Sequence, residues 1–270
     1  MSELMQEVVA HYGGDDLADR LLRAAQAAGI ATISPESLAP VDQFHAGGLA
    51  STRALALFAG LKPGETVLDI GCGLGGPARV LAAEFGCRVT GLDVSPDLVA
   101  AARILTERCG LAGRATFEAG DALALPFASG AFDIVWTQHV VMNIRNRQQF
   151  IDEAARVLRP GGRLVFFDTL LGANRAPLDY PLPWARTPDI SFLHDEADTR
   201  AFLTRAGLAE ERWEDVTGQM AEELRRQAAP GPFSLSIMLG DDMPQRVTNV
   251  GRAISDGRFR LVRGLFVKPS

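Results

Sequence analysis

The stretch ETVLDIGCGLGGPARVLAAEFGCRV, residues 65–89, decides the fold of this chain. An apolar run enters a glycine-rich turn, and a helical pattern follows it. Gly71, Gly73 and Gly76 have the spacing G-x-G-x-x-G, which is typical of a turn that places a pyrophosphate at a helix N-terminus. Asp69, at the end of the predicted strand, would face and repel such a phosphate. The stretch therefore predicts a strand–turn–helix unit but leaves its ligand open.

The composition excludes several classes of protein. The 270 residues are 47% hydrophobic and 22% charged, as in an ordinary globular protein. A net charge of −6 offers no basic surface for nucleic acid. The N-terminus lacks the pattern of a signal peptide, no run resembles a membrane span, and the three cysteines include no C-x-x-C pair. We therefore expect a cytoplasmic protein with no metal site, no membrane and no nucleic-acid partner.

Short apolar strands alternate with helices from Thr66 onward. The expected strands are 66–70, 87–94, 115–121, 132–139 and 162–170. The expected helices between them are 77–85, 96–110 and 147–158. Continuous apolar strands with interleaved helices predict an α/β fold, a doubly wound parallel sheet that is covered on both faces.

The N-terminal part of the chain lies outside this alternation. We expect helices at 3–28 and 50–61, with a loop over 29–49 between them. We assign residues 1–60 to an N-terminal helical lid and residues 61–270 to the core.

The C-terminal part adds two segments that we expect to cover a substrate. Residues 172–193 are rich in proline and aromatic residues, and residues 218–254 read as a helical insertion. Two closing strands are expected at 208–216 and 258–269.

Three carboxylates stand at the ends of three successive predicted strands. They are Asp69, Asp93 and Asp121. A doubly wound sheet binds ligands beyond the carboxyl ends of its strands. There Asp93 suits two ribose hydroxyls, and Asp121 with the Ala122 N–H suits the edge of an adenine. An acid at Asp69 suits an ammonium group, so the three together favour an amino-acid-tailed nucleoside over a dinucleotide.

These motifs as a set resemble the class I S-adenosylmethionine-dependent methyltransferases of the small-molecule type, such as quinone, tocopherol and sarcosine/dimethylglycine methyltransferases. The resemblance covers about residues 60–170 and includes Asp93. The segments that carry it are VLDIGCGLGG (67–76), GDALALPF (120–127), FDIVWTQH (132–139) and RVLRPGGRLVFFD (156–168). It implies a Rossmann-like, seven-stranded sheet with an antiparallel final strand, and S-adenosylmethionine as the cofactor.

The resemblance also implies where the cofactor lies. Its methionine end would lie near Asp69 and Gly71, its ribose on Asp93 and its adenine on Asp121. The expected cofactor contacts are Asp69, Gly71, Cys72, Gly73, Asp93, Val94, Gly120, Asp121, Ala122, Gln138 and His139.

His139 is the candidate general base, because it follows the fourth predicted strand and faces the same cleft. Correct orientation alone supplies roughly 7–11 kcal/mol of a barrier. A base is therefore needed only if the methyl acceptor must lose a proton. His45 is a second candidate. A His139 that only hydrogen-bonds the cofactor or the fold stays an open alternative.

The substrate is expected to lie under the lid and the first insertion. The candidate substrate contacts are Tyr12, Phe44, His45, Asn143, Tyr180, Trp184 and Phe192. The aromatic residues suit a lipophilic ring or a cage around a cationic amine, or they simply pack the insertion on the sheet.

The function predicted is methyl transfer from S-adenosylmethionine to an oxygen, nitrogen or carbon atom of a small molecule. An NAD-dependent oxidoreductase and a non-catalytic cofactor-binding scaffold are the alternatives on a similar fold. The partner expected is a small-molecule substrate, with a homodimer as an open possibility for assembly.

Overall fold

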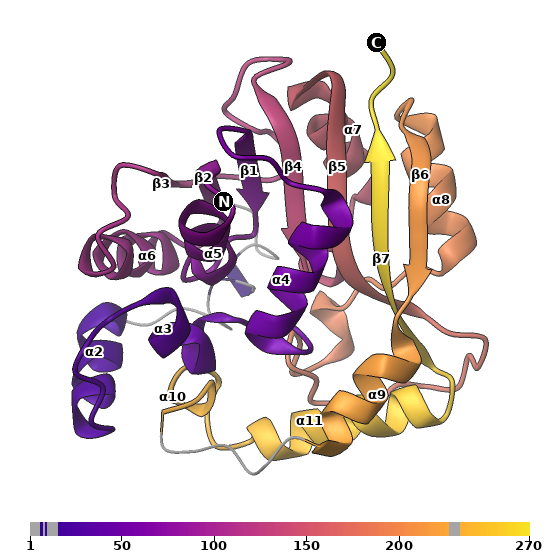
Figure 1. The fold of residues 1–270 in the computed structure, drawn as a ribbon. Coiled ribbons are helices and arrows are strands. Elements are labelled where there is room, and N and C mark those ends of the chain that lie inside the picture. Colours follow the sequence, from indigo (N-terminus) through magenta and orange to yellow (C-terminus); the bar gives the residue numbers. More distant parts are fainter. Residues whose placement is uncertain (1–5, 8, 10–15, 227–232) are drawn as a thin grey trace.

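The structure of the chain is a computed structural model, and it describes residues 6–7, 9, 16–226 and 233–270. Its centre is one seven-stranded sheet in the order β3-β2-β1-β4-β5-β7-β6 (Figure 1). The strands are β1 (Thr66–Ile70), β2 (Arg88–Asp93), β3 (Ala115–Ala119), β4 (Phe132–Gln138), β5 (Leu158–Leu171), β6 (Ala209–Asp215) and β7 (Phe259–Val267). β1 to β5 are parallel, and β7 is antiparallel to β5 and β6. This confirms the predicted sheet and its antiparallel closing strand.

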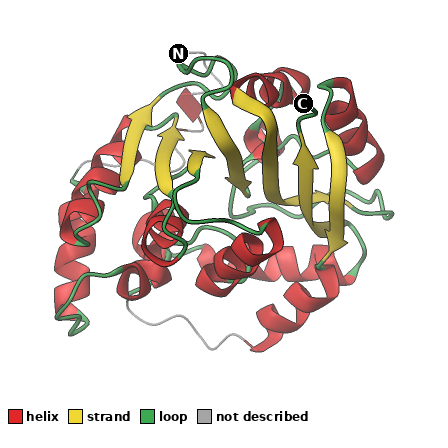
Figure 2. Cartoon of the chain, turned by 45° about the horizontal axis from the view of Figure 1, so that its top comes forward, coloured by secondary structure: helices red, strands yellow, loops and turns green. Residues whose placement is uncertain are grey.

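Helices cover both faces of this sheet (Figure 2). They are α2 (Leu17–Ala27), α3 (Pro35–Asp42), α4 (Gly48–Ala59), α5 (Gly76–Glu84), α6 (Pro96–Arg108), α7 (Arg147–Val157), α8 (Glu196–Arg205), α9 (Thr217–Arg226), α10 (Ser236–Leu239) and α11 (Met243–Ser255). Phe150 of α7 and Leu203 of α8 pack with Leu68 of β1 in one buried cluster. Leu55 of α4 packs with Trp136 of β4 in a second cluster on the other face. A parallel sheet that is buried on both faces explains why its strands are apolar throughout.

The predicted loop over residues 29–49 is wrong, because α3 lies within it. The Ser34 hydroxyl accepts a hydrogen bond from the Ser37 N–H at 3.2 Å, and the Ser34 N–H donates to the Ser37 hydroxyl at 2.9 Å. Pro35 occupies the first turn, where a missing N–H costs nothing. The sequence hid this helix because Pro40, inside it, reads as a helix breaker.

A buried ion pair ties α3 to α5. The Asp42 and Arg79 side chains are fully buried and 2.8 Å apart, and Arg79 also donates to the Thr106 hydroxyl at 2.9 Å. α4 confirms the helix expected over 50–61. The division into lid and core at residue 60 stays a prediction.

The two C-terminal segments differ in structure as expected. Residues 172–193 are irregular except for a short 3-10 turn at Pro188–Ile190, whereas residues 218–254 include α10 and most of α9 and α11. No helix in the described part of the chain is long and apolar enough to cross a membrane.

Candidate functional site

The turn between β1 and α5 fits tightly against the loop that follows β4. Gly71 has a φ of 73°, and a Cβ there would overlap the Val140 side chain. Gly73 has a φ of 52°, and its N–H donates to Asp93 Oδ2 at 2.9 Å. Glycine is required here for the left-handed backbone and for the close approach of Val140. The turn is thereby fixed to the end of β2.

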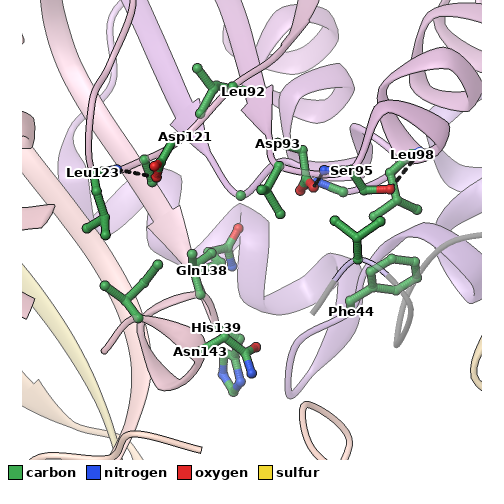
Figure 3. Close-up of a pocket in the computed structure, with 18 of the residues that line it drawn as sticks. Phe44, Leu92, Asp93, Ser95, Leu98, Asp121, Leu123, Gln138, His139 and Asn143 are labelled. Carbon is green, nitrogen blue, oxygen red and sulfur yellow. Dashed lines mark hydrogen bonds between the residues drawn. The ribbon is translucent and has the colours of Figure 1, made fainter. Parts of the chain in front are cut away.

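A pocket of about 200 Å³ lies at the carboxyl ends of the strands, beside this turn (Figure 3). β1 pairs with β2 on one side and β4 on the other, so strand order reverses here. The lining residues are Val9, Phe44, Gly71, Gly73, Leu92, Asp93, Val94, Ser95, Leu98, Gly120, Asp121, Ala122, Leu123, Gln138, His139, Val140, Asn143, Ile144 and Arg145.

Most of the expected cofactor contacts line this pocket. They are Gly71, Gly73, Asp93, Val94, Gly120, Asp121, Ala122, Gln138 and His139. Asp69 and Cys72 are buried behind the turn and are not among the lining residues. The residues that sequence reasoning missed include Leu98, Leu123 and Arg145. Only Leu123 had a signal, the apolar run after Asp121.

Asp93 and Asp121 lie along one edge of the pocket (Figure 3). Asp93 accepts the Gly73 N–H on Oδ2 and the Ser95 N–H on Oδ1, each at 2.9 Å. Asp121 Oδ1 accepts the Leu123 N–H at 2.8 Å. These bonds orient both carboxylates, and each oxygen keeps a second lone pair for a ligand hydroxyl or amine.

Asp69 is a buried acid whose Oδ2 has no hydrogen-bond partner. Burial and the neighbouring Asp93 raise the pKa of Asp69 well above its usual value, and burial raises the pKa of Asp93 as well. Two adjacent carboxyl groups with raised pKa values favour a ligand that brings a positive charge. These carboxyl groups therefore fit a nucleoside that carries an ammonium or sulfonium group.

His139 lies across the pocket from Asp93 and Asp121 (Figure 3), and its Nε2 is buried with no hydrogen-bond partner among the described residues. Its φ is 52°, unusual for a residue other than glycine. The ring packs edge-on against Phe167, with centroids 4.7 Å apart. Burial, and less strongly His45, lower the pKa of His139 to about 3. The imidazole is therefore neutral at neutral pH.

His45 belongs to a hydrogen-bonded network beside the pocket. Its Nε2 is 3.0 Å from both the Gln43 Oε1 and the Thr52 hydroxyl, and the hydroxyl donates to Gln43 at 2.7 Å. The His45 and His139 rings are 6.2 Å apart between centroids. Burial lowers the pKa of His45 to about 4, so it is also neutral. His45 itself does not line the pocket.

Gln138 is a lining residue of the pocket whose amide is held from the protein side. Its Oε1 accepts the Trp136 indole N–H at 3.0 Å, which fixes the amide orientation. Its Nε2 is buried without a partner. Gln138 and His139, neighbours in the chain, thus each bring a buried side-chain nitrogen without a described partner to the wall of the pocket. The Thr52 hydroxyl is also 3.3 Å from Gln138 Oε1, so the network of His45 joins the end of α3, α4 and β4, and sequence spacing gives no sign of it.

The expected substrate contacts are divided. Phe44 and Asn143 line the pocket. Asn143 Nδ2 also donates to the backbone oxygens of Trp184 and Ile190, at 3.0 and 2.8 Å. Asn143 thus holds residues 172–193 against the site.

The aromatic residues of this segment are not among those lining the pocket. Trp184 is buried, packs against Phe259 and donates to the Ser191 hydroxyl at 3.0 Å. Phe192 lies under the Arg145 guanidinium, and Tyr180 packs on the core. Their substrate roles stay predictions.

Tyr12 lies outside the described residues. Among the residues that are described, no group of three or more His, Cys, Asp or Glu side chains is arranged to hold a metal ion.

Sequence comparison places these residues among known proteins. Residues 68–166 match the family model described as a methyltransferase domain. The chain is 38% identical over 161 residues to 2-methyl-6-phytyl-1,4-hydroquinone methyltransferase of Synechocystis sp., covering 58% of this chain and 49% of that protein. It is 36% identical over 173 residues to 27-O-demethylrifamycin SV methyltransferase of Amycolatopsis mediterranei, covering 62% and 64%. The chain therefore matches less than two thirds of the length of either relative.

A solved structure shares the whole fold. The geranyl diphosphate C-methyltransferase of Streptomyces coelicolor has a TM-score of 0.73 and covers 99% of this chain and 98% of its own. At 17% identity this likeness concerns the fold alone.

Proposed function

We propose that residues 68–166, which match a methyltransferase domain, are of the class I, S-adenosylmethionine-dependent type, and that the protein methylates a hydroxyl oxygen of a small, largely apolar molecule. The comparisons give no support to the NAD-dependent oxidoreductase. The small-molecule acceptors of the two named relatives motivate the substrate class.

The observation that carries this proposal is the contrast between the two sides of the pocket. Asp93, which lines the pocket, and the neighbouring buried Asp69 are acids with raised pKa values, whereas His139 across the pocket from Asp93 is neutral with a buried, unpartnered nitrogen. S-adenosylmethionine, when bound, supplies a methyl carbon activated by a positively charged sulfur. Asp93 would hold the ribose and Asp121 the adenine, and Asp69 would favour the cationic end by ionising as the positive charge approaches.

Gln138 and His139 together match a hydroxyl group. A hydroxyl accepts a hydrogen bond from the Gln138 amide and donates one to a neutral imidazole nitrogen. His139 is then placed to accept the hydroxyl proton. A pKa of about 3 does not prevent this role, because a hydroxyl proton becomes strongly acidic as its oxygen acquires a methyl group.

The experiment is a two-part assay on the full chain. Calorimetry with S-adenosylhomocysteine measures binding, and mass spectrometry measures methyl transfer to a panel of lipophilic alcohols, phenols and amines. We expect binding, and methylation of hydroxyl compounds only. No binding would contradict the cofactor assignment. Transfer to amines would contradict the acceptor assignment, and binding without any transfer would favour the non-catalytic scaffold.

His139→Asn tests the base, because asparagine tolerates a positive φ and has no imidazole. We expect turnover to fall by about 100-fold or more with little change in cofactor affinity. His194→Asn is the matched control, because His194 is paired with Asp198 and does not line the pocket.

A further inference from the structure

The loop after β4, which carries His139, is held by two residues on the side of the sheet that α7 and α8 cover. Asp168 of β5 accepts the Val140 N–H on Oδ1 at 3.1 Å. Arg147, at the start of α7, donates through Nη2 to the Val141 oxygen at 2.6 Å. His139 lies between the end of β4 and these two contacts, and its φ is 52°. This unusual backbone conformation depends on the bonds that hold Val140 and Val141 in place.

Arg147 also connects this loop to the first insertion. The same Nη2 donates to the Phe192 backbone oxygen at 3.1 Å, and the Phe192 N–H donates to the Met142 oxygen at 2.7 Å. Both Asp168 and Arg147 are buried, with 1% and 3% exposure. Neither lines the ligand pocket. They therefore act on the pocket only through the loop.

A small cavity lies beside the Asp168 and Arg147 side chains. It has about 20 Å³ of space, lies between the sheet, α7 and α8, and is lined by both residues and by Thr137 of β4. Thr137 Oγ1, Arg147 Nε and Asp168 Oδ2 are all buried without a partner. One water needs roughly 10–15 Å³ and two to four polar partners. A single water in this space would accept from Arg147 Nε and donate to Asp168 Oδ2 and Thr137 Oγ1.

We propose that Asp168 and Arg147, bridged by one water in this cavity, are positioning residues that set the orientation of His139. The proposal rests on the proposed function for its effect on turnover. The positioning of the loop by Asp168 and Arg147 can be tested without any methyl transfer.

The charge of Asp168 makes this unit sensitive to pH. Burial raises the pKa of Asp168 to about 7, although Arg147 and the N–H groups of the loop oppose the rise. Burial lowers the pKa of Arg147 to about 10, so it stays charged. An ionised carboxylate accepts hydrogen bonds more strongly than a protonated one. The hold on the loop is therefore stronger above pH 7.

No other described charge faces Asp168 directly. Thr137 from β4 and Thr199 from α8 line the same cavity and are uncharged. Val262 of β7 lies opposite Asp168 in the sheet. His194, before α8, interacts with Arg147 and has a lowered pKa, chiefly through burial. Asp168 is thus the group whose pKa lies near 7, whereas the pKa of His194 is lowered from its usual value, and a variant of each residue separates their effects.

The experiment compares the kcat–pH profiles of the wild type, Asp168→Asn and His194→Asn. In the wild type we expect kcat to rise as pH passes about 7. In Asp168→Asn, which keeps an oxygen for the Val140 N–H, we expect the step to disappear and kcat above pH 7 to fall about tenfold or more. S-adenosylhomocysteine affinity should stay unchanged. A step that persists in Asp168→Asn, or that disappears in His194→Asn, would overturn the proposal.

Thr137→Val provides a second variant that keeps both direct bonds to the loop. It removes only the hydroxyl that holds the proposed water, so we expect the midpoint of the kcat step to move upward by a measurable fraction of a pH unit. An unmoved midpoint would contradict the bridging water.

An NMR titration separates this proposal from the proposed function. The His139 ring resonances should shift with a midpoint near pH 7 in the wild type and not in Asp168→Asn, even if no methyl transfer is found. Resonances that do not respond near pH 7 would contradict the coupling, whatever the activity.

Discussion

The neutral state of His139 makes a quantitative prediction about stability. Its pKa is about 3 in the folded protein and about 6.5 in an unfolded chain. A group whose folded pKa is lowered contributes stability that is present above about pH 6.5 and is lost as pH falls toward 3. Between pH 7 and pH 5 the unfolded histidine takes up a proton and the folded one does not. This difference amounts to about 2 kcal/mol, at 1.36 kcal/mol per pKa unit.

His139→Asn removes the part of the pH-dependent loss of stability that comes from His139. The variant keeps a neutral side chain, and asparagine accepts the positive φ. Asp168, Asp69 and Asp93 have raised pKa values, so they favour the folded state as pH falls. Their effect opposes that of His139 but is common to both proteins. It therefore cancels when the pH dependence of the variant is compared with that of the wild type.

Urea unfolding at pH 7, 6 and 5, followed by tryptophan fluorescence, measures the effect. We expect the free energy of unfolding of His139→Asn to gain about 2 kcal/mol on that of the wild type between pH 7 and pH 5. His194→Asn is the control and should gain less, because that side chain is 28% exposed and paired with Asp198. Parallel pH profiles for His139→Asn and the wild type would show that His139 titrates as an ordinary histidine, and would refute the reasoning.

Three further predictions concern the acids. Asp93→Ala should weaken S-adenosylhomocysteine binding by tenfold or more, since about 1.5–3 kcal/mol is typical of hydrogen bonds to a charged group; calorimetry on a variant with unchanged circular dichroism checks it. Asp42→Ala should lose about 3–5 kcal/mol of unfolding free energy in urea, because it leaves the Arg79 charge buried without its ion-pair partner; an unchanged urea midpoint would contradict the buried ion pair between α3 and α5. S-adenosylmethionine should release protons on binding, because its positive charge lowers the raised pKa of Asp69; a binding enthalpy independent of the buffer would contradict this.

The sequence predicted the parts of the fold that depend on local pattern. Alternating apolar strands and helices gave the sheet, and Asp93 and Asp121 at two strand ends located the pocket. These signals are legible because side-chain periodicity and strand ends are properties of a short segment. α3 was missed because Pro35 and Pro40 suggest a loop, although a proline in the first turn is compatible with a helix.

The contacts around the two histidines were not predictable in the same way. The network of His45 joins Gln43, Thr52 and Gln138, which come from separate elements. Asp168 was visible only as part of a strand, and nothing in its neighbourhood of sequence indicates that it accepts the Val140 N–H. Such contacts depend on how the elements pack, which a single sequence does not encode locally.

Burial acts in opposite directions on the two sides of the pocket, and this determines what the pocket can do. It disfavours charge of either sign, so it raises the pKa of the carboxyl groups of Asp69 and Asp93 and lowers that of the His139 imidazole. A cationic cofactor reverses the effect on the acids, since it offers them the opposite charge that the described side chains beside them do not provide. Its net positive charge disfavours protonation of His139, so the imidazole stays neutral. The cofactor that the acids stabilise is thus one that leaves His139, the base we propose, neutral and able to accept a proton.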